Sequence, residues 1–235
     1  MQFPFEQFPA LSAVGICRHA FAQRIPGVDV SHDKAEVLKR LDAAHREIGN
    51  AIGVGDWPLF TAQQIHGNKI AVAAAVGSSR RADRTPRRGI PVHEFRACDG
   101  IVTDQRGIVL GVYVADCCAV YIVDSKTPAI GLVHSGRKGT ELGVVPNAIT
   151  QMSDRFGSDP ANMLVQLSPC IRAPHYEVDF AAEIVRQCRA LGVKEIHNSD
   201  VCTACNLYRY YSYRAEKGKT GRMLALIGLN PTIEK

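Results

Sequence analysis

The sequence predicts an α+β fold in which mixed β-sheets are flanked by helices. Three observations favour this class: segments with helical spacing of apolar residues, short runs rich in Val and Ile, and the Gly, Pro and Asp residues that separate them. The chain has 235 residues, of which 46% are hydrophobic, so it is long enough to bury one sizeable core. We therefore expect a single domain over residues 1–235.

Three helices are expected from the spacing of apolar side chains. The first covers residues 31–49, after a capping Ser31 or Asp33 and before a glycine, and two more end at Gly157 and Gly192. The apolar positions are Val37, Leu41, Ala44 and Ile48; Ala148, Ile149, Met152 and Phe156; and Ile184, Val185, Cys188 and Leu191. Cys188 is accordingly expected to pack in the core.

Five runs rich in Val and Ile are expected to be strands: residues 69–76, 108–115, 119–124, 129–134 and 163–167. The three runs between residues 108 and 134 follow one another closely. A crossover helix between parallel strands needs about a dozen residues or more, so these three runs are expected to pair in antiparallel fashion.

The net charge of +5 is modest, and much of the excess lies in residues 77–91, at Arg80, Arg81, Arg84, Arg87 and Arg88. A role in steering an anionic substrate or binding nucleic acid is conceivable for such a segment. No aromatic residues are interleaved for base stacking, and no nucleic-acid motif accompanies the arginines. A solvated loop is therefore favoured, and no nucleic-acid partner is predicted.

The location predicted from the sequence is cytoplasmic. No apolar run approaches the roughly 20 residues of a membrane-spanning helix, and the first residues lack the basic and apolar regions of a secretory signal. In a reducing compartment the eight cysteines are better explained as buried residues, metal ligands or nucleophiles than as disulfide partners.

The residues best suited to bind a metal or to act as a nucleophile lie where the expected strands begin or end. His66 precedes the run that starts at Lys69, Cys117 follows the run 108–115, and His134 ends the run 129–134. Two imidazoles and a thiolate suit Zn²⁺ and leave a fourth position for water or substrate. From spacing alone, histidines hydrogen-bonded for structural reasons are the more frequent explanation, so both interpretations stay open at this point.

Other Cys and His residues give weaker signals. Cys118 should point to the opposite face of its strand from Cys117, so core packing is expected. Cys202 and Cys205 form a C-x-x-C pair without a second pair or a thioredoxin-like context, so neither zinc binding nor redox activity is predicted. His175 is a candidate for the lining of a pocket, whereas nothing singles out His19, His32, His45, His93 and His197 over surface residues.

A series of short motifs runs through the chain. They are Gln63-Gln-Ile-His-Gly67, Asp99-Gly-Ile-Val-Thr-Asp104, Ala115-Asp-Cys117, His134-Ser-Gly-Arg-Lys-Gly139, Ser168-Pro-Cys-Ile171, Tyr176-Glu-Val178, Cys202-Thr203, Tyr211-Ser-Tyr-Arg214 and Gly221-Arg222. In residue types and order they resemble the laccase-domain family, whose members are also called multicopper polyphenol oxidases, zinc-type purine nucleoside phosphorylases and peptidoglycan editing factors. The resemblance implies a laccase-domain (cysteine-hydrolase-like) α/β sandwich.

The resemblance also implies roles for individual residues. His66, Cys117 and His134 match the family's metal ligands and would be the catalytic residues, with zinc preferred over copper. Arg18 would bind phosphate or another anion. Tyr176 and Glu177 match a motif with a structural role, and a carboxylate there would hold a ligating His in its tautomer.

The chain departs from the family pattern at two places. Arg137 stands where the family has Trp, and Ser168-Pro169 replaces Gly-Pro. An arginine in place of an aromatic wall favours an anionic ligand over plain stacking, so Arg137 is a second candidate for substrate binding.

The function implied is a zinc-dependent purine nucleoside phosphorylase with adenosine deaminase-type activity, acting on a purine nucleoside and phosphate. One alternative is an amidase that edits peptidoglycan precursors, with Cys117 as ligand or as a nucleophile assisted by His66 or His134. A copper-dependent polyphenol oxidase is less favoured, because a multicopper centre needs about ten His ligands in H-x-H pairs. This chain has eight His and no such pair. A protein whose metal is purely structural is a further alternative.

Overall fold

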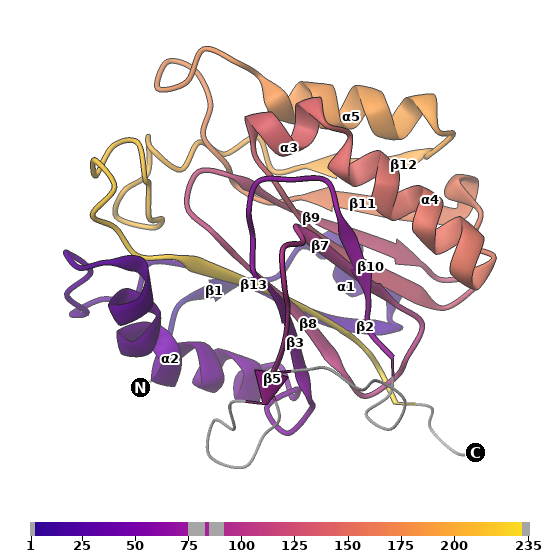
Figure 1. Cartoon of the computed structure of the whole chain (residues 1–235), viewed down its shortest axis with the longest axis horizontal. Coiled ribbons are helices and arrows are strands. Elements are labelled where there is room, and N and C mark those ends of the chain that lie inside the picture. Colours follow the sequence, from indigo (N-terminus) through magenta and orange to yellow (C-terminus); the bar gives the residue numbers. More distant parts are fainter. Residues whose placement is uncertain (1–2, 75–82, 85–91, 232–235) are drawn as a thin grey trace.

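Two β-sheets lie face to face with helices on their outer sides (Figure 1). The computed structural model describes residues 3–74, 83–84 and 92–231. The first sheet has the strand order β1-β2-β13-β8-β3-β6-β5 and the second β12-β11-β9-β10-β7-β4. The strands of the first sheet are β1 (Phe5–Glu6), β2 (Cys17–Ala22), β13 (Met223–Leu229), β8 (Val109–Val114), β3 (Leu59–Ala62), β6 (Val92–Phe95) and β5 (Asp83–Arg84). Those of the second are β12 (Glu195–Asn198), β11 (Met163–Leu167), β9 (Cys118–Asp124), β10 (Ala129–Ser135), β7 (Gly100–Thr103) and β4 (Ile70–Val72).

The helices are α1 (Pro9–Val14), α2 (Lys34–Ala51), α3 (Arg137–Glu141), α4 (Val144–Phe156), α5 (Phe180–Ala190) and the 3₁₀ turn η1 (Pro160–Asn162). Helices α4 and α5 cover the outer side of the second sheet, and α2 lies against the first (Figure 1). Asp33 and Asp179 cap α2 and α5 by accepting backbone N–H groups, while α4 ends at Gly157, which has a φ of 73°. Mixed sheets flanked by helices confirm the predicted fold class.

Most of the expected elements are present with small shifts at their ends. The three predicted helices correspond to α2, α4 and α5, and the five predicted strands to β4, β8, β9, β10 and β11. Cys188 and Cys118 are fully buried, as expected. Three of the histidines that nothing singled out in the sequence, His19, His45 and His93, are buried and lie beside aromatic rings.

One pairing prediction is wrong. Strands β9 and β10 are antiparallel neighbours as expected, but β8 does not pair with β9. It pairs with β13 and β3 in the other sheet. Asp116 lies between the two strands with a φ of 78°, and the chain crosses there from the first sheet to the second.

Two groups of apolar side chains hold the layers together. One lies between the sheets and includes Phe21, Leu110, Tyr121 and Leu132; the other lies between the second sheet, α4 and α5. The first group draws on both sheets, so the two sheets share one apolar core. The arginine-rich segment 77–91 lies outside the described residues, apart from the backbone of β5. Within the described ranges, no helix is both long and apolar enough to cross a membrane.

Candidate metal centre

The register of β9 and β10 brings Cys117 and His134 together. Ser135 is the partner of Cys118 across the two antiparallel strands, so the residues on either side of this pair meet at one end of the second sheet. His66 reaches the same place from the connection between β3 and β4. The ligand atoms of His66, Cys117 and His134 all lie within 4.8 Å of one another.

The backbone around the three residues is shaped to present them. His66 has a φ of 59° and Asp116, next to Cys117, has a φ of 78°. This left-handed conformation costs a residue with a side chain about 1–2 kcal/mol and is found at functional sites. At Gly136, a Cβ atom would come 2.5 Å from the Cys117 Sγ, so only glycine leaves room for the thiol.

Asp99 is a buried carboxylate that organises two of the three candidate ligands. Its Oδ1 accepts hydrogen bonds from the His134 ring Nδ1 at 2.9 Å and from the His66 backbone N–H at 2.8 Å. Its Oδ2 accepts from the N–H groups of Ile65 at 3.2 Å and Gly67 at 2.7 Å. With Nδ1–H directed at Asp99, His134 presents Nε2 to Cys117 and to a metal.

The sequence prediction had given this kind of role to the motif that contains Glu177. In the structure the Glu177 side chain is exposed and pairs with Arg214 at 3.8 Å, so it does not contact the three candidate ligands. Asp99 belongs to a motif that was recognised, but nothing in its spacing relates it to His134. Their contact arises because β7 and β10 are neighbouring strands.

The electrostatic environment favours a thiolate at Cys117. Burial opposes ionisation of this thiol, but the charge of His134 and hydrogen bonds from His134 and His66 outweigh it and lower the pKa of Cys117 to about 6. Burial also disfavours a charged His134, yet Cys117 and Asp99 raise the pKa of His134 to about 9. A divalent metal binds thiolate and neutral imidazole, so it would displace the proton that the metal-free pair holds on His134.

The donor set fits zinc. A tetrahedral zinc ion keeps its ligand atoms about 3.5 Å apart, which these side chains reach by a small contraction. His134 is buried, Cys117 half-buried and His66 exposed, so the cluster is open on one side. In the part of the chain that the structure describes, this is the one group of His, Cys, Asp or Glu side chains with such geometry.

A cavity of about 740 Å³ lies over the open side of the cluster. Five of its lining side chains are cations: Lys34, Arg137, Arg214, Lys217 and Arg222. Four are aromatic: Tyr113, Tyr176, Phe180 and Tyr213. The one carboxylate of the lining is Asp116. A cavity of this size accommodates a small molecule with a flat ring and a negative charge.

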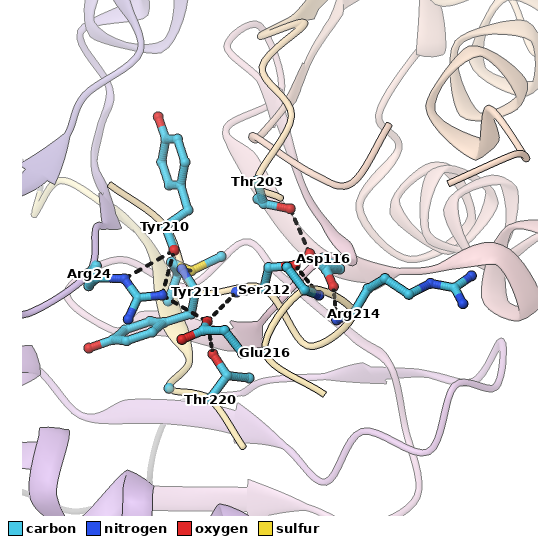
Figure 2. A network of polar contacts seen from close by, with 12 residues as sticks. Arg24, Asp116, Thr203, Tyr210, Tyr211, Ser212, Arg214, Glu216 and Thr220 are labelled. Carbon is cyan, nitrogen blue, oxygen red and sulfur yellow. Dashed lines mark hydrogen bonds and ion pairs between the residues drawn. The ribbon is translucent and has the colours of Figure 1, made fainter. Parts of the chain in front are cut away.

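Two carboxylates hold the segment 203–222, which forms one wall of the cavity (Figure 2). Asp116 accepts hydrogen bonds from the Thr203 hydroxyl and from the Arg214 backbone N–H, both at 2.7 Å. Glu216 accepts from the Ser212 N–H at 3.0 Å and the Thr220 hydroxyl at 2.6 Å, and pairs with Arg24 at 2.7 Å. Since Asp116 adjoins Cys117, it connects the wall to the candidate metal ligands.

The structure separates the two predicted substrate-binding arginines. Arg137 lines the cavity, and its guanidinium pairs with Glu141 at 2.9 Å. Arg18 is not part of the lining: it donates to the carbonyl groups of Ile52 and Gly53 and to Asn230.

Sheet register shows how far Arg18 lies from the cluster. Arg18 is opposite Gly228, and Gly228 is opposite Val109, whereas the cavity is lined by Ala115 at the other end of β8. That separation is about 20 Å along an extended strand. Arg18 therefore cannot act in this cavity as placed. His175 is exposed and also outside the lining, which includes its neighbour Tyr176.

The sequence of this chain is similar to those of known proteins. A family model described as "Multi-copper polyphenol oxidoreductase laccase" matches residues 12–185 and 178–230. A purine nucleoside phosphorylase of Streptomyces coelicolor is 28% identical, over 80% of this chain and 82% of that protein. One of Corynebacterium glutamicum is also 28% identical, over 92% of this chain and 91% of that protein.

Two solved structures share the fold. The YlmD protein of Geobacillus stearothermophilus superposes with a TM-score of 0.75 at 20% identity, over 97% of this chain and 100% of that one. A hypothetical protein YfiH of Bacillus licheniformis gives a TM-score of 0.74 at 22% identity, over 91% and 93% of the two chains. At these identities the superpositions establish the fold.

Proposed function

This chain belongs to the multi-copper polyphenol oxidoreductase laccase family, and from that premise we propose that it is a zinc-dependent purine nucleoside phosphorylase. The observation that carries the proposal is the position of the His66, Cys117 and His134 cluster at the base of a cavity lined by cations and aromatic rings. The relatives from Streptomyces and Corynebacterium bear the name of this activity. Aromatic side chains suit a purine, and cations suit phosphate.

We propose zinc as the metal, in preference to copper. Multicopper oxidation needs several coppers and about ten His ligands, whereas the described residues bring together one cluster with two His. A thiolate with two imidazoles and an open side is typical of catalytic zinc. When bound, the metal would supply Lewis-acid polarisation and lower the pKa of a water molecule towards about 7.

The protein side chains would bind and orient the two substrates. In phosphorolysis a phosphate oxygen forms a bond to C1′ of the ribose while the bond from C1′ to the purine nitrogen breaks, and the departing base takes the electron pair and the proton that the hydrogen phosphate ion gives up. Tyr176 and Tyr213 offer faces for the purine, and the cations of the lining hold the phosphate next to C1′. Adenosine deaminase-type hydrolysis belongs to the same proposal. In that reaction water displaces the amino group of the purine, and the amino group leaves as ammonia.

The test uses zinc-loaded protein with inosine and phosphate, and separately with adenosine. We expect hypoxanthine and ribose 1-phosphate from the first mixture, only when phosphate is present, and ammonia from the second. His66→Ala should abolish both activities. His32→Ala should not, because His32 is exposed and pairs with Asp29 outside the cavity. Fully zinc-loaded protein that forms none of these products would contradict the proposal.

A second candidate function is favoured by one observation, the chain of contacts from Cys117 through His134 to Asp99. A thiolate, an imidazole and a carboxylate in this order are the parts of a cysteine hydrolase, here an amidase acting on peptidoglycan precursors. Because the pKa of Cys117 is lowered to about 6, metal-free protein should be alkylated by iodoacetamide with a midpoint near pH 6. The rate should fall below that pH, where the thiol regains its proton.

Zinc distinguishes the two candidates. If Cys117 is a ligand, one equivalent of zinc should protect it from iodoacetamide, and a chelator should restore the reaction. Equal alkylation with and without zinc, together with release of an amine from a muropeptide, would favour the amidase.

Domain organisation, location and partners form part of the same proposal. We propose that residues 1–235 act as one domain in the cytoplasm, on small molecules and without a nucleic-acid or membrane partner. The shared core between the sheets supports one domain, and the eight free cysteines are compatible with a reducing compartment.

A further inference from the structure

We propose that Lys34 and Arg222 form a phosphate-binding subsite in the cavity above the candidate metal centre. The proposal rests on the proposed function for the identity of the reaction, since phosphorolysis needs bound phosphate. The binding it describes can be measured without turnover. No feature of the sequence had suggested either residue as a phosphate ligand, because they come from opposite parts of the chain and line the same cavity only in the folded protein.

The balance of charges in the cavity supports an anionic ligand. Arg137 and Arg214 have carboxylate partners, Glu141 and Glu177, at the rim. The carboxylate of the lining, Asp116, accepts hydrogen bonds through both of its oxygens. Lys34 and Arg222 form no ion pair with a carboxylate among the residues that the structure describes, and neither does Lys217. These cations can therefore pair with an anionic ligand.

The backbone holds both residues in place. Lys34 is the first residue of α2, whose start is capped by Asp33 through hydrogen bonds from the N–H groups of Ala35 and Glu36. Arg222 immediately precedes β13. These positions fix the points at which the two side chains leave the backbone.

The guanidinium of Arg222 has one nitrogen hydrogen-bonded to backbone carbonyl groups, and its other N–H donors are available to a ligand. Its Nη1 donates to the carbonyl groups of Thr220 at 3.0 Å and Gly221 at 2.8 Å, and the guanidinium lies over the Tyr213 ring at 5.7 Å. In the described part of the chain, no acceptor is bound to Nε or Nη2. Two adjacent N–H donors of a guanidinium match two oxygens of a phosphate.

The charge of Arg222 acts on Lys34. Burial lowers the pKa of Lys34 and the positive charge of Arg222 lowers it further, while the negative charges of Glu94 and Asp99 act in the opposite direction. Burial likewise lowers the pKa of Arg222, while the charges of Tyr213, Cys117 and Asp116 act in the opposite direction. Arg222 lines the same cavity as the candidate metal ligands His66, Cys117 and His134. A dianion bound by Lys34 and Arg222 would offset the repulsion between their charges.

The ligand chemistry is a phosphate group, which has two sources. It can be free phosphate, the second substrate of phosphorolysis, or the 5′-phosphate of a nucleotide. An ammonium and a guanidinium fork that approach from different elements suit a tetrahedral group with three acceptor oxygens better than they suit a planar carboxylate.

The test is calorimetric titration of the zinc-loaded protein with inorganic phosphate, with inosine in the absence of phosphate, and with AMP. For Lys34→Gln we expect the Kd of phosphate or of AMP to rise about tenfold, and the Kd of inosine to stay unchanged. Lys39→Gln is the matched control, because Lys39 is an exposed lysine of the same helix whose ammonium lies 3.8 Å from Glu36. Arg222→Lys, which retains the charge and loses the fork, should give a smaller rise than Arg222→Gln.

The titrations with inorganic phosphate and with AMP distinguish free phosphate from the 5′-phosphate of a nucleotide as the ligand. A rise with inorganic phosphate assigns the subsite to the free substrate, and a rise confined to AMP assigns it to the nucleotide. If Lys34→Gln and Lys39→Gln bind phosphate and AMP equally well, the subsite is wrong. If phosphate binding depends on Lys34 but no nucleoside is cleaved, the subsite stands and the proposed function fails.

Discussion

The base of the cavity and its wall differ in how their side chains are held. At the base, His134 and Asp99 are buried, and their hydrogen bonds join the end of β10 to the loop that carries His66. On the wall, the side chain of Arg214 is 55% exposed and pairs with the exposed Glu177, and Arg137 of α3, elsewhere in the lining, is 51% exposed and pairs with the exposed Glu141. Buried, multiply bonded groups tolerate few substitutions, whereas exposed cations change at small cost in stability. The base therefore sets the chemistry, and the wall is where specificity can vary.

Removing the thiolate at the base should have the largest effect. In Cys117→Ser the hydroxyl stays protonated at neutral pH and is a poor zinc ligand, so we expect zinc affinity to fall at least about 100-fold and turnover to disappear. Zinc per chain and phosphorolysis measure the two effects. Cys205→Ser is the control, since Cys205 is exposed and outside the cavity lining. Full zinc occupancy in Cys117→Ser would show that the cluster is not the metal centre.

Changing Asp99 tests whether the base depends on its supporting carboxylate. Asn offers one acceptor oxygen where Asp99 accepts from His134 and three backbone N–H groups. We expect Asp99→Asn to lower zinc affinity about 10- to 100-fold and the free energy of unfolding by about 3 kcal/mol. Competition with a chromophoric chelator and urea unfolding report these values. Asp104 is exposed and follows β7, the strand that begins just after Asp99. Asp104→Asn should therefore change neither the zinc affinity nor the free energy of unfolding. Unchanged zinc affinity in Asp99→Asn would show that the candidate ligands at the base do not depend on Asp99.

A substitution in the support of the wall should affect substrate binding and leave the metal in place. Glu216→Gln weakens the contacts to Arg24, Ser212 and Thr220 that hold the segment 203–222 (Figure 2). We expect KM for the nucleoside to rise about fivefold, which corresponds to about 1 kcal/mol, with zinc content unchanged. The exposed Glu195→Gln serves as the control. Loss of zinc from Glu216→Gln would mean that base and wall are not independent.

The smallest effect is expected at Arg18, which belongs to neither region. Arg18→Gln loses hydrogen bonds to Ile52 and Gly53, so the free energy of unfolding should fall by about 1 kcal/mol. KM for phosphate should not change. A rise in KM as large as that of Lys34→Gln would instead return Arg18 to the substrate site, by a rearrangement that the present geometry does not contain.

Local patterns in the sequence were sufficient for much of the fold. The helical spacing of Val37, Leu41 and Ile48 and the Val and Ile runs of β9 and β10 reflect side-chain burial within one element, which depends on near neighbours along the chain. Strand pairing was predicted correctly for β9 with β10 and incorrectly for β8 with β9. A short connection can turn back within a sheet or cross to another, and the left-handed Asp116 sends the chain across.

The candidate site likewise depends in part on local sequence and in part on tertiary structure. The residue types and order of the motifs were enough to single out His66, Cys117 and His134, and the folded chain brings these three together. Only the tertiary structure showed that Asp99 holds two of them, that Arg18 lies about 20 Å along the sheet from the cavity, and that Lys34 and Arg222 face the same cavity. The physical reason is that a motif specifies which side chains stand at the end of a strand. Which strand ends adjoin is decided by sheet register and by the packing of one sheet on the other.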